Sequence, residues 1–411
     1  IILSLLSAAC VSAADLAKVS FEKDILPILE DNCFSCHGDG EAKGDLSLDE
    51  LKTASDVHRG YKIWEKVRKL VLANEMPPEK KKKRPDVKQR ALLADWTRHT
   101  LDTFYRTAPP DPGRVTVRRL NRAEYNNTIR DLMRVDFKPA KDFPADDSGY
   151  GFDNIGDVLT MSPLLMEKYF AAAEKIAAKA VAIPDADGRI AATPFQKFYF
   201  RYPVPLKLRR NAAEGFVRTF LTRAYRRPVR ADEVRRLMLL AKQVVDDGAS
   251  FEHGIRMAVV ATLVSPHFLF RWEFDGAPKN PKAIRSLNEH ELASRLSFFI
   301  WNSMPDDTLM ELAQRGQLRK NLPTQIRRML RDAKAQSLVA NFTGQWLQLR
   351  NLEMLQPDKR LFSAFNNELR ADMRRETEML FAHVMRDNRS VLDLLDADYT
   401  FVNERLAIWY G

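Results

Sequence analysis

The chain has 411 residues and a formal net charge of +10 at pH 7, from 65 lysines and arginines against 55 aspartates and glutamates. This length is enough for several domains whose stability comes from the burial of apolar side chains. The charge does not indicate nucleic-acid binding, because the arginines are spread along predicted helices and do not alternate with aromatic residues as in a single-strand platform. We expect an anionic glycan, an acidic partner protein or an envelope surface as the counterpart.

Residues 1–14 have the composition of a signal peptide. Ile1 to Leu6 form an apolar run, and the small residues that follow suit cleavage just before Ala14 or Asp15. Because a starting Met and a basic segment are missing, we expect the chain to begin within the signal. Cys10 leaves a lipid anchor open, although the residues before it fit a lipidation box poorly. The signal segment predicts export of the mature chain to the periplasm or cell envelope. No later stretch approaches the ~20 consecutive apolar residues of a membrane-spanning helix, so no such helix is expected in the mature chain.

Cys33-Phe34-Ser35-Cys36-His37 spell the C-x-x-C-H pattern by which a chain is attached covalently to haem. Two thiols at this spacing reach the two vinyl groups of one porphyrin edge, and His37 is presented to the iron as the proximal ligand. Such attachment occurs after export, so the motif and the signal segment support each other. A C-x-x-C pair can also be a redox dithiol or half of a zinc site. The chain has no cysteine left for a structural disulfide.

Met76 is the predicted distal ligand of the haem iron. It lies in Asn74-Glu75-Met76-Pro77-Pro78, where the prolines prevent the loop from continuing as a helix and allow a thioether to be held toward the iron. Alternatively, Met76 only fills a gap in the hydrophobic core and has no role at the haem. His58 and His99 compete as sixth ligands, and histidine ligation would lower the reduction potential.

Apolar patterns predict a small helical domain over residues 15–106. One helix precedes the cysteines, a second covers Tyr61 to Leu72, and a third begins after Pro85. Lys80 to Arg84 form a basic run, which is either a solvated loop or a docking patch for an acidic redox partner. Residues 107–113 are rich in Pro and Gly and close the domain as a linker.

The rest of the chain is predicted to be mostly helical, in domains over 114–183, 195–275 and 285–411. The clearest helices are Leu120 to Met133 with Asn121 as N-cap, Ser162 to about Val181, a helix capped by Asn288, Leu338 to Leu347, and Asn366 to Met385. Phe198 to Leu206 is the most strand-like run, but its prolines restrict it to a sheet edge or an extended crossing. The predicted fold class is mainly α, with a small class I-like cytochrome c helical domain followed by a larger, mostly α-helical multi-domain region.

A polar loop, Phe143 to Asn154, carries several carboxylates. It could hold Ca²⁺, which takes oxygen ligands from flexible loops, but the carboxylates between Asp146 and Asp157 lack the spacing of a known calcium loop. A glycine-kinked loop whose carboxylates form turns and caps is the expectation.

Recognisable catalytic motifs are missing from the sequence after the linker. His267 follows a proline in an apolar segment and could serve chemistry, although a histidine packed at a helix end is commoner. His290-Glu291 do not begin an H-E-x-x-H motif, because Ser294 stands where the second histidine would be. No G-x-S-x-G, Walker or dinucleotide-binding pattern is present.

The order of these segments resembles a known family. Cys33 to His37 with Lys43 to Asp49 and Glu75 to Pro78 looks like the planctomycete-type cytochrome c domain. Further segments resemble the uncharacterised helical domains fused to it in planctomycete envelope proteins: Arg119 to Thr128, Phe220 to Pro228, Ser265 to Arg271, Leu287 to Phe299 and Asp396 to Ala407. The resemblance implies haem binding and electron transfer in a cell envelope, and a chain that continues past Gly411, so that this one is expected to be cut at both ends. It supplies no substrate.

Two functions of different classes remain open. The first is an exported c-type cytochrome with one covalent haem that transfers single electrons in the cell envelope, while the helical region docks a partner or binds a substrate such as a polysaccharide. The second is a haem-coupled oxidoreductase acting on an extracellular or periplasmic substrate such as a glycan. A purely structural envelope protein would leave Cys33, Cys36, His37 and Met76 unexplained.

Overall fold

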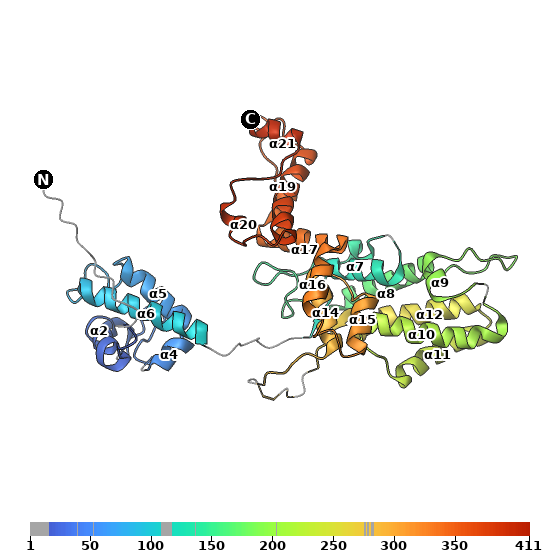
Figure 1. The fold of residues 1–411 in the computed structure, drawn as a ribbon, viewed down its shortest axis with the longest axis horizontal. Helices are drawn as coiled ribbons and strands as arrows, with labels where there is room; N and C mark the ends of the chain where they lie inside the picture. Colours follow the sequence, from blue (N-terminus) through green and yellow to red (C-terminus); the bar gives the residue numbers. More distant parts are fainter. Residues whose placement is uncertain are drawn as a thin grey trace. The chain divides into compact units, whose positions relative to one another are not determined.

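The computed structural model describes residues 16–38, 40–51, 53–107, 117–135, 137–202, 204–274, 277, 279–280 and 283–411. The predicted signal segment with Cys10, and residues 108–113 of the predicted linker, lie outside them. The chain divides into two compact units, Ile1–Gly113 and Arg114–Gly411, and its mainly α fold is confirmed (Figure 1). None of the helices in the described ranges combines the length and the hydrophobicity needed to cross a membrane.

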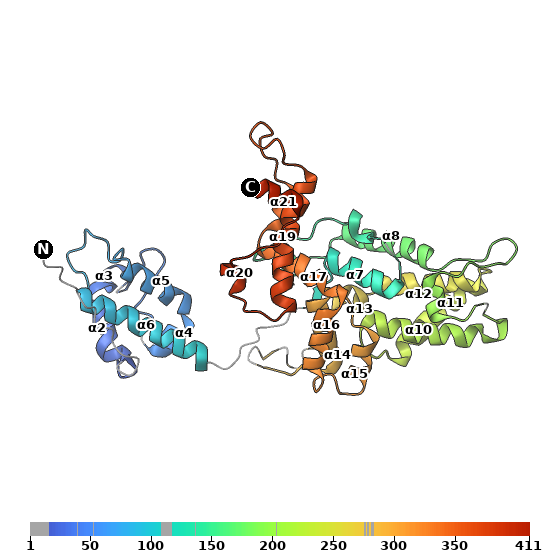
Figure 2. The same ribbon diagram turned by 45° about the horizontal axis from the view of Figure 1, so that its top comes forward.

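The smaller unit is built from short helices. They are η1 (Phe21–Ile25, a π-helical turn), α2 (Leu26–Asn32), α3 (Phe34–His37), α4 (Ala54–Arg59), α5 (Tyr61–Leu72) and α6 (Val87–Thr107). The three predicted helices are therefore confirmed, and α5 has the predicted bounds. Figure 2 shows α5 and α6 side by side.

An aromatic cluster fixes the helix that leads to the cysteines. Trp64 on α5 and Trp96 on α6 meet edge to face, with ring centroids 6.2 Å apart. Phe21 lies 6.1 Å from Trp64 and 5.5 Å from Trp96, and all three side chains are buried. Because aromatic rings contribute large apolar areas and prefer such tilted contacts, this cluster holds η1 and α2 against the two long helices.

The larger unit begins with a pair of strands from distant parts of the chain. β1 (Arg118–Arg119) is antiparallel to β2 (Phe270–Arg271), with Arg118 opposite Arg271. Helix α7 (Arg122–Met133) follows at once. Its N-cap Asn121 accepts from the backbone N–H of Glu124, whose side chain accepts from the backbone N–H of Asn121 in return, so the predicted cap is confirmed as a capping box.

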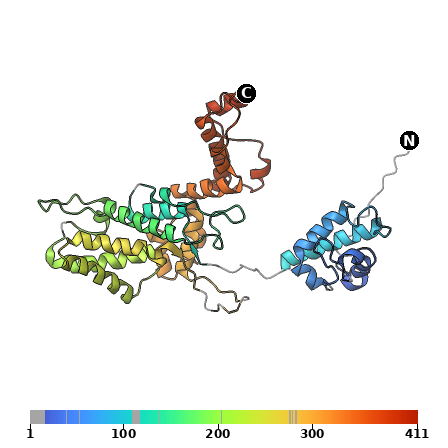
Figure 3. The ribbon, with the colours of Figure 1, turned by 180° about the vertical axis from the view of Figure 1, so that it is seen from behind.

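Long helices form the centre of this unit (Figure 3). They are α8 (Pro163–Ala180), α10 (Arg209–Tyr225), α11 (Ala231–Asp246) and α12 (Phe251–Leu263), with η2 (Pro139–Asp142) and α13 (Pro266–Leu269) at their ends. One hydrophobic cluster runs through them from Leu120 to Met304. The predicted domain boundaries within the larger unit stay predictions, since this core is shared across them.

Phe198 to Leu206 do not form a strand. Pro194–Tyr199 is helix α9, which begins at a capping box of Thr193 and Gln196, and Leu206–Leu208 is the short helix η3. The sequence also allowed an extended crossing, and residues 200–202 and 204–205 do have an irregular conformation between these two helices. The ring of Phe200 stacks on Phe216 of α10 at 5.1 Å, so its aromatic character serves helix packing.

The C-terminal part is a succession of helices. They are α14 (Glu289–Ile300), α15 (Asp307–Gln314), α16 (Leu322–Arg331), η4 (Ala333–Ala335), α17 (Gln336–Leu338), η5 (Val339–Thr343), α18 (Gly344–Trp346), η6 (Leu349–Glu353), α19 (Asn367–Arg386), α20 (Asp393–Asp396) and α21 (Glu404–Tyr410). The N-cap Asn288 and the helix from Asn366 are confirmed. The helix expected over Leu338 to Leu347 is also present, with a π-helical turn, η5, inside it.

Candidate haem-binding site

Cys33, Cys36 and His37 lie on one helical turn. The N–H of Cys33 donates to the carbonyl of Leu29 at 2.7 Å, at the end of α2. The carbonyl of Cys33 then accepts from the N–H groups of Cys36 (3.1 Å) and His37 (3.0 Å). Residues three apart on a helix share a face, so the backbone presents both thiols on one side. Both cysteines are free and half-buried.

The segment after the motif folds back onto it. The N–H of Lys43 donates to the carbonyl of Cys36 at 2.9 Å, and the N–H of Leu48 donates to the carbonyl of His37 at 2.5 Å. Gly38 permits this return, because a Cβ there would lie 3.0 Å from the ring of Phe34 and about as close to Asp49. The backbone of the motif is therefore held from both sides.

The two thiols differ in acidity. Burial raises the pKa of Cys33 to about 11, and the neighbouring Cys36 adds to the effect. Partial burial acts in the same direction on Cys36, but hydrogen bonds from Lys81 and Ser35 and the charges of Lys81 and Lys43 lower its pKa overall. Cys36 is thus the more readily ionised thiol, and the thiolate is the reactive form of cysteine. Sequence reasoning placed Lys81 only in the basic run and missed this contact.

The imidazole of His37 has a ring nitrogen without a partner. Its Nδ1 is buried and makes no hydrogen bond. No hydrogen bond within the described residues holds this nitrogen, so the ring is not fixed by it in a purely structural role and can serve as a ligand. The half-buried thiols and this orphaned imidazole together form a donor set that fits haem c.

Met76 lies on the loop that follows α5. Its side chain is 37% exposed and does not belong to the apolar core of the smaller unit, so core packing does not account for it. Its N–H donates to the carbonyl of Leu70 at 3.3 Å, and its peptide bond to Pro77 is cis. The loop is held to the start of α6, because Arg84 and Arg90 both donate to the side-chain oxygen of Asn74. The role of Met76 as a ligand stays a prediction.

The competing histidines lie elsewhere in the smaller unit. The ring of His58 on α4 stacks on Phe104 of α6, with centroids 4.6 Å apart and planes 18° from parallel. His99 lies half-buried on α6. The stacking contact occupies one face of His58 and gives that side chain a packing role.

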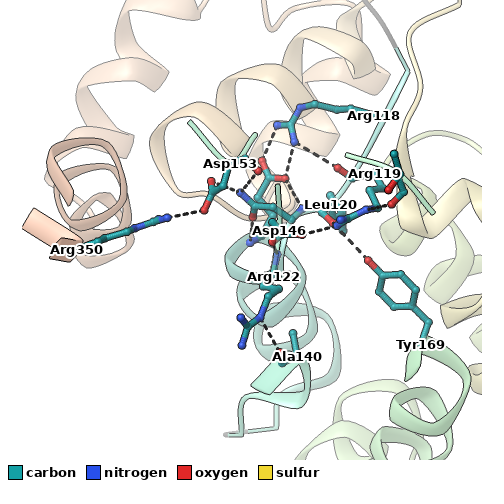
Figure 4. Close-up of polar contacts among 12 residues, drawn as sticks. Arg118, Arg119, Leu120, Arg122, Ala140, Asp146, Asp153, Tyr169 and Arg350 are labelled. Atoms are coloured by element: carbon teal, nitrogen blue, oxygen red, sulfur yellow. Dashed lines mark hydrogen bonds and ion pairs between the residues drawn. The ribbon is translucent and has the colours of Figure 1, made fainter. Parts of the chain in front are cut away.

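The polar loop of the larger unit lies at a cluster of buried ion pairs (Figure 4). Asp146 accepts from Nη1 of Arg119 at 2.7 Å and from the backbone N–H of Arg122 at 2.7 Å. The side chains of Arg119 and Asp146 are only 6% and 5% exposed. A carboxylate buried this deeply needs a cationic partner, and Arg119 supplies it.

Asp153 makes the second set of contacts from this loop. It accepts from Nη1 of Arg350 at 2.7 Å and from Nδ2 of Asn121 at 2.9 Å, and its N–H donates to Oε1 of Gln345 at 2.7 Å. Both carboxylates therefore pair with arginines and hold the N-terminal turn of α7. Across the described ranges, no group of three His, Cys, Asp or Glu side chains could hold a metal.

Glu124 is the most deeply buried carboxylate of the cluster. Arg118 donates to both of its oxygens, at 2.6 and 2.7 Å, and Arg271 lies 4.0 Å away. Burial opposes its ionisation, but Arg118 and Arg271 lower the pKa of Glu124 overall. With both oxygens engaged, Glu124 is a structural anion rather than a general base. The capping pattern of Asn121 and Glu124 was the one sequence signal for its position.

His267 is the second residue of α13 and lies near two aromatic rings. Its centroid is 5.2 Å from that of Tyr225 and 6.0 Å from that of Trp272. Burial and the charge of Arg227 lower the pKa of His267. Its Nε2 is 3.8 Å from Glu233, which already accepts two hydrogen bonds from Arg227. His267 is therefore partly packed, with 42% of its side chain exposed.

The matches to known families fall in both units of the chain, one in the smaller unit and three in the larger unit. Residues 33–80 match the planctomycete cytochrome C family, which makes this a cytochrome-like haem protein. Three families described as proteins of unknown function match residues 118–182 (DUF1587), 212–273 (DUF1595) and 287–411 (DUF1592). No curated protein and no solved structure matches the chain. The chain therefore belongs to the proteins that join a planctomycete cytochrome c domain to the DUF1587, DUF1595 and DUF1592 domains.

Proposed function

We propose that this protein is an exported c-type cytochrome that carries one covalent haem and transfers single electrons in the cell envelope. The observation that supports it most directly is the single helical turn bearing Cys33, Cys36 and His37, within residues matched to a cytochrome family. Bound haem would supply a one-electron redox couple.

Each residue of the site has a role in this proposal. Cys33 and Cys36 hold the haem through thioether bonds, and His37 is the proximal ligand. Met76 is the distal ligand, on a loop anchored through Asn74. The lowered pKa of Cys36 makes it the more reactive thiol before attachment.

The basic run suits electron exchange with an acidic redox protein. Lys80, Lys81, Lys82 and Lys83 are exposed and follow the loop of Met76 directly. A positive surface next to the predicted haem ligand raises the rate of encounter with an anionic partner and orients it. An anionic glycan or envelope surface would be attracted by the same charges.

The test is production in a host able to mature c-type cytochromes. We expect haem staining that survives denaturation, one haem per chain, and an absorption band from sulfur-to-iron charge transfer in the oxidised protein. Met354→Ala, at a methionine that is 74% exposed, is the matched control and keeps this band. A purified chain without covalent haem would contradict the proposal.

A further inference from the structure

A groove of about 640 Å³ lies between α10, α11 and the start of α12. Figures 1 and 3 show these three helices packed along one another in the larger unit. Cavities of roughly 300–1,000 Å³ are the usual size for small-molecule sites. The apolar side chains that line it include Ala213, Val234, Met238, Leu239, Phe251 and Ile255.

The polar side chains of the groove are almost all cationic. Five lysines or arginines line it against one carboxylate, Glu214: they are Arg209, Arg210, Arg218, Arg235 and Lys242. Glu214 already pairs with Arg218 at 3.1 Å. Lys242 pairs with Asp246, outside the groove. Arg209, Arg210 and Arg235 have no carboxylate partner in the described part of the chain, so the groove carries uncompensated positive charge.

Two of these arginines occupy an unfavourable place. Arg209 and Arg210 begin α10, whose first turn has no acidic residue and no side-chain cap. The helix dipole disfavours cations at this end. The guanidinium of Arg209 lies 5.6 Å from the ring centre of Phe251, and its buried Nε has no hydrogen-bond partner. An anionic group at this end of the groove would satisfy Arg209 and offset the repulsion.

We propose that the groove binds a single-chain anionic amphiphile of the fatty carboxylate type. The acyl chain covers the apolar floor around Met238 and Phe251, and the carboxylate lies between Arg209 and Arg210. A small inorganic anion would leave the floor uncovered, and a neutral or cationic amphiphile would leave the arginines unpaired. All residues that line the groove belong to the larger unit.

The test is calorimetric titration of the whole chain with laurate below its micellar concentration. Dodecyltrimethylammonium, which keeps the chain and inverts the charge, and inorganic phosphate, which keeps the charge, are the comparison probes. We expect laurate to bind at least about tenfold more tightly than either probe, because the cationic amphiphile lacks the charge-assisted hydrogen bonds and phosphate lacks the apolar chain.

Matched variants separate the site from general charge. Arg209→Gln combined with Arg210→Gln should weaken laurate binding about tenfold or more. Arg327→Gln combined with Arg331→Gln removes the same charge from exposed positions on α16 that do not line the groove, and should leave binding unchanged. Met238→Trp fills the floor without altering charge and should also weaken binding. Circular dichroism confirms that each variant is folded.

Three results would overturn the proposal. Equal affinity for dodecyltrimethylammonium would show that the arginines play no part. Equal weakening in the two double arginine variants would trace binding to net charge. The third result is sedimentation of the protein with phosphatidylglycerol vesicles that excess laurate does not reverse. It would show that the arginines serve attraction to a membrane surface.

Discussion

Nη2 of Arg84 donates to both the backbone carbonyl of Asn74, at 2.8 Å, and its side-chain oxygen, at 2.7 Å. Arg84 ends the basic run, yet it is half-buried and engaged, whereas the lysines before it are exposed. Asn74 has a positive φ of 58° and stands two residues before Met76. One member of the apparent docking patch therefore anchors the loop of the predicted distal ligand.

Arg84→Gln should loosen this loop and reduce the fraction of haem iron with a methionine ligand. The sulfur-to-iron band of the oxidised protein, followed with temperature, measures that fraction. The band should disappear at a lower temperature in the variant, because the two hydrogen bonds to Asn74 are lost. Lys82→Gln removes the same charge from an exposed neighbour and should behave as the parent protein. Identical melting of the band in both variants would refute the anchoring role.

Met76→Ala should keep haem attached and change its sixth coordination. Losing a thioether ligand lowers the reduction potential and opens the iron to an external ligand. We expect the sulfur-to-iron band to vanish and carbon monoxide to bind the reduced protein rapidly. His58→Ala and His99→Ala should leave both properties unchanged. If one of these histidine variants lost its native ligation while Met76→Ala did not, that histidine would be the distal ligand.

Local signals predicted the helices well. The apolar repeat from Tyr61 to Leu72 and the caps Asn121 and Asn288 depend on residues close together in sequence, and the structure confirms them. The prediction of extended structure from Phe198 was wrong at the start of that run. β propensity reflects packing context more than backbone preference, and the capping box at Thr193 favoured a helix through Tyr199.

The contacts of the sites depend on the fold. Asp153 and Arg350 are far apart in sequence, and nothing near either residue indicates its partner. The calcium alternative for the polar loop stayed open for this reason. The contact of Lys81 with Cys36 was equally hidden, since the basic run reads as a surface feature until the loop is folded against the motif.

Both cysteines are expected to hold the haem. Cys33→Ala or Cys36→Ala should leave at most one thioether bond, which shifts the absorption maximum of the reduced pyridine complex away from the two-bond form. Ser35→Ala, between the two cysteines, is the control and should retain the two-bond spectrum, because the attachment motif leaves this position free. A two-bond spectrum in either motif variant would remove the basis for the attachment motif.

The acidity of the two thiols predicts a pH profile in the haem-free chain. The pKa of Cys36 lies below the usual thiol value of 9.0 and that of Cys33 is about 11, so the thiolate of Cys36 forms first as pH rises. Labelling with iodoacetamide at about pH 7 to 9 should therefore be faster at Cys36 than at Cys33. Peptide mapping measures the label at each cysteine. Lys81→Met should move the Cys36 profile to higher pH, and Lys82→Met should not. Equal labelling rates at the two cysteines would contradict the assigned pKa directions.

The buried pair of Arg119 and Asp146 should be important for the stability of the larger unit. Arg119→Leu leaves the carboxylate of Asp146 buried without its guanidinium, which costs roughly 3–5 kcal/mol when one partner of such a pair is removed. The midpoint of denaturant unfolding, followed by circular dichroism, should fall accordingly. Arg360→Leu breaks an exposed pair with Asp358 and should cause no measurable change.

A second substitution distinguishes the loss of a partner from the loss of packing. In Arg119→Leu combined with Asp146→Asn, the uncompensated negative charge is gone, so part of the lost stability should return. The stability of this double variant should lie above that of Arg119→Leu alone. If the loss of stability in the double variant equalled the sum of the losses in Arg119→Leu and in Asp146→Asn measured separately, the two side chains would act independently. The ion pair would then not be what joins the polar loop to β1.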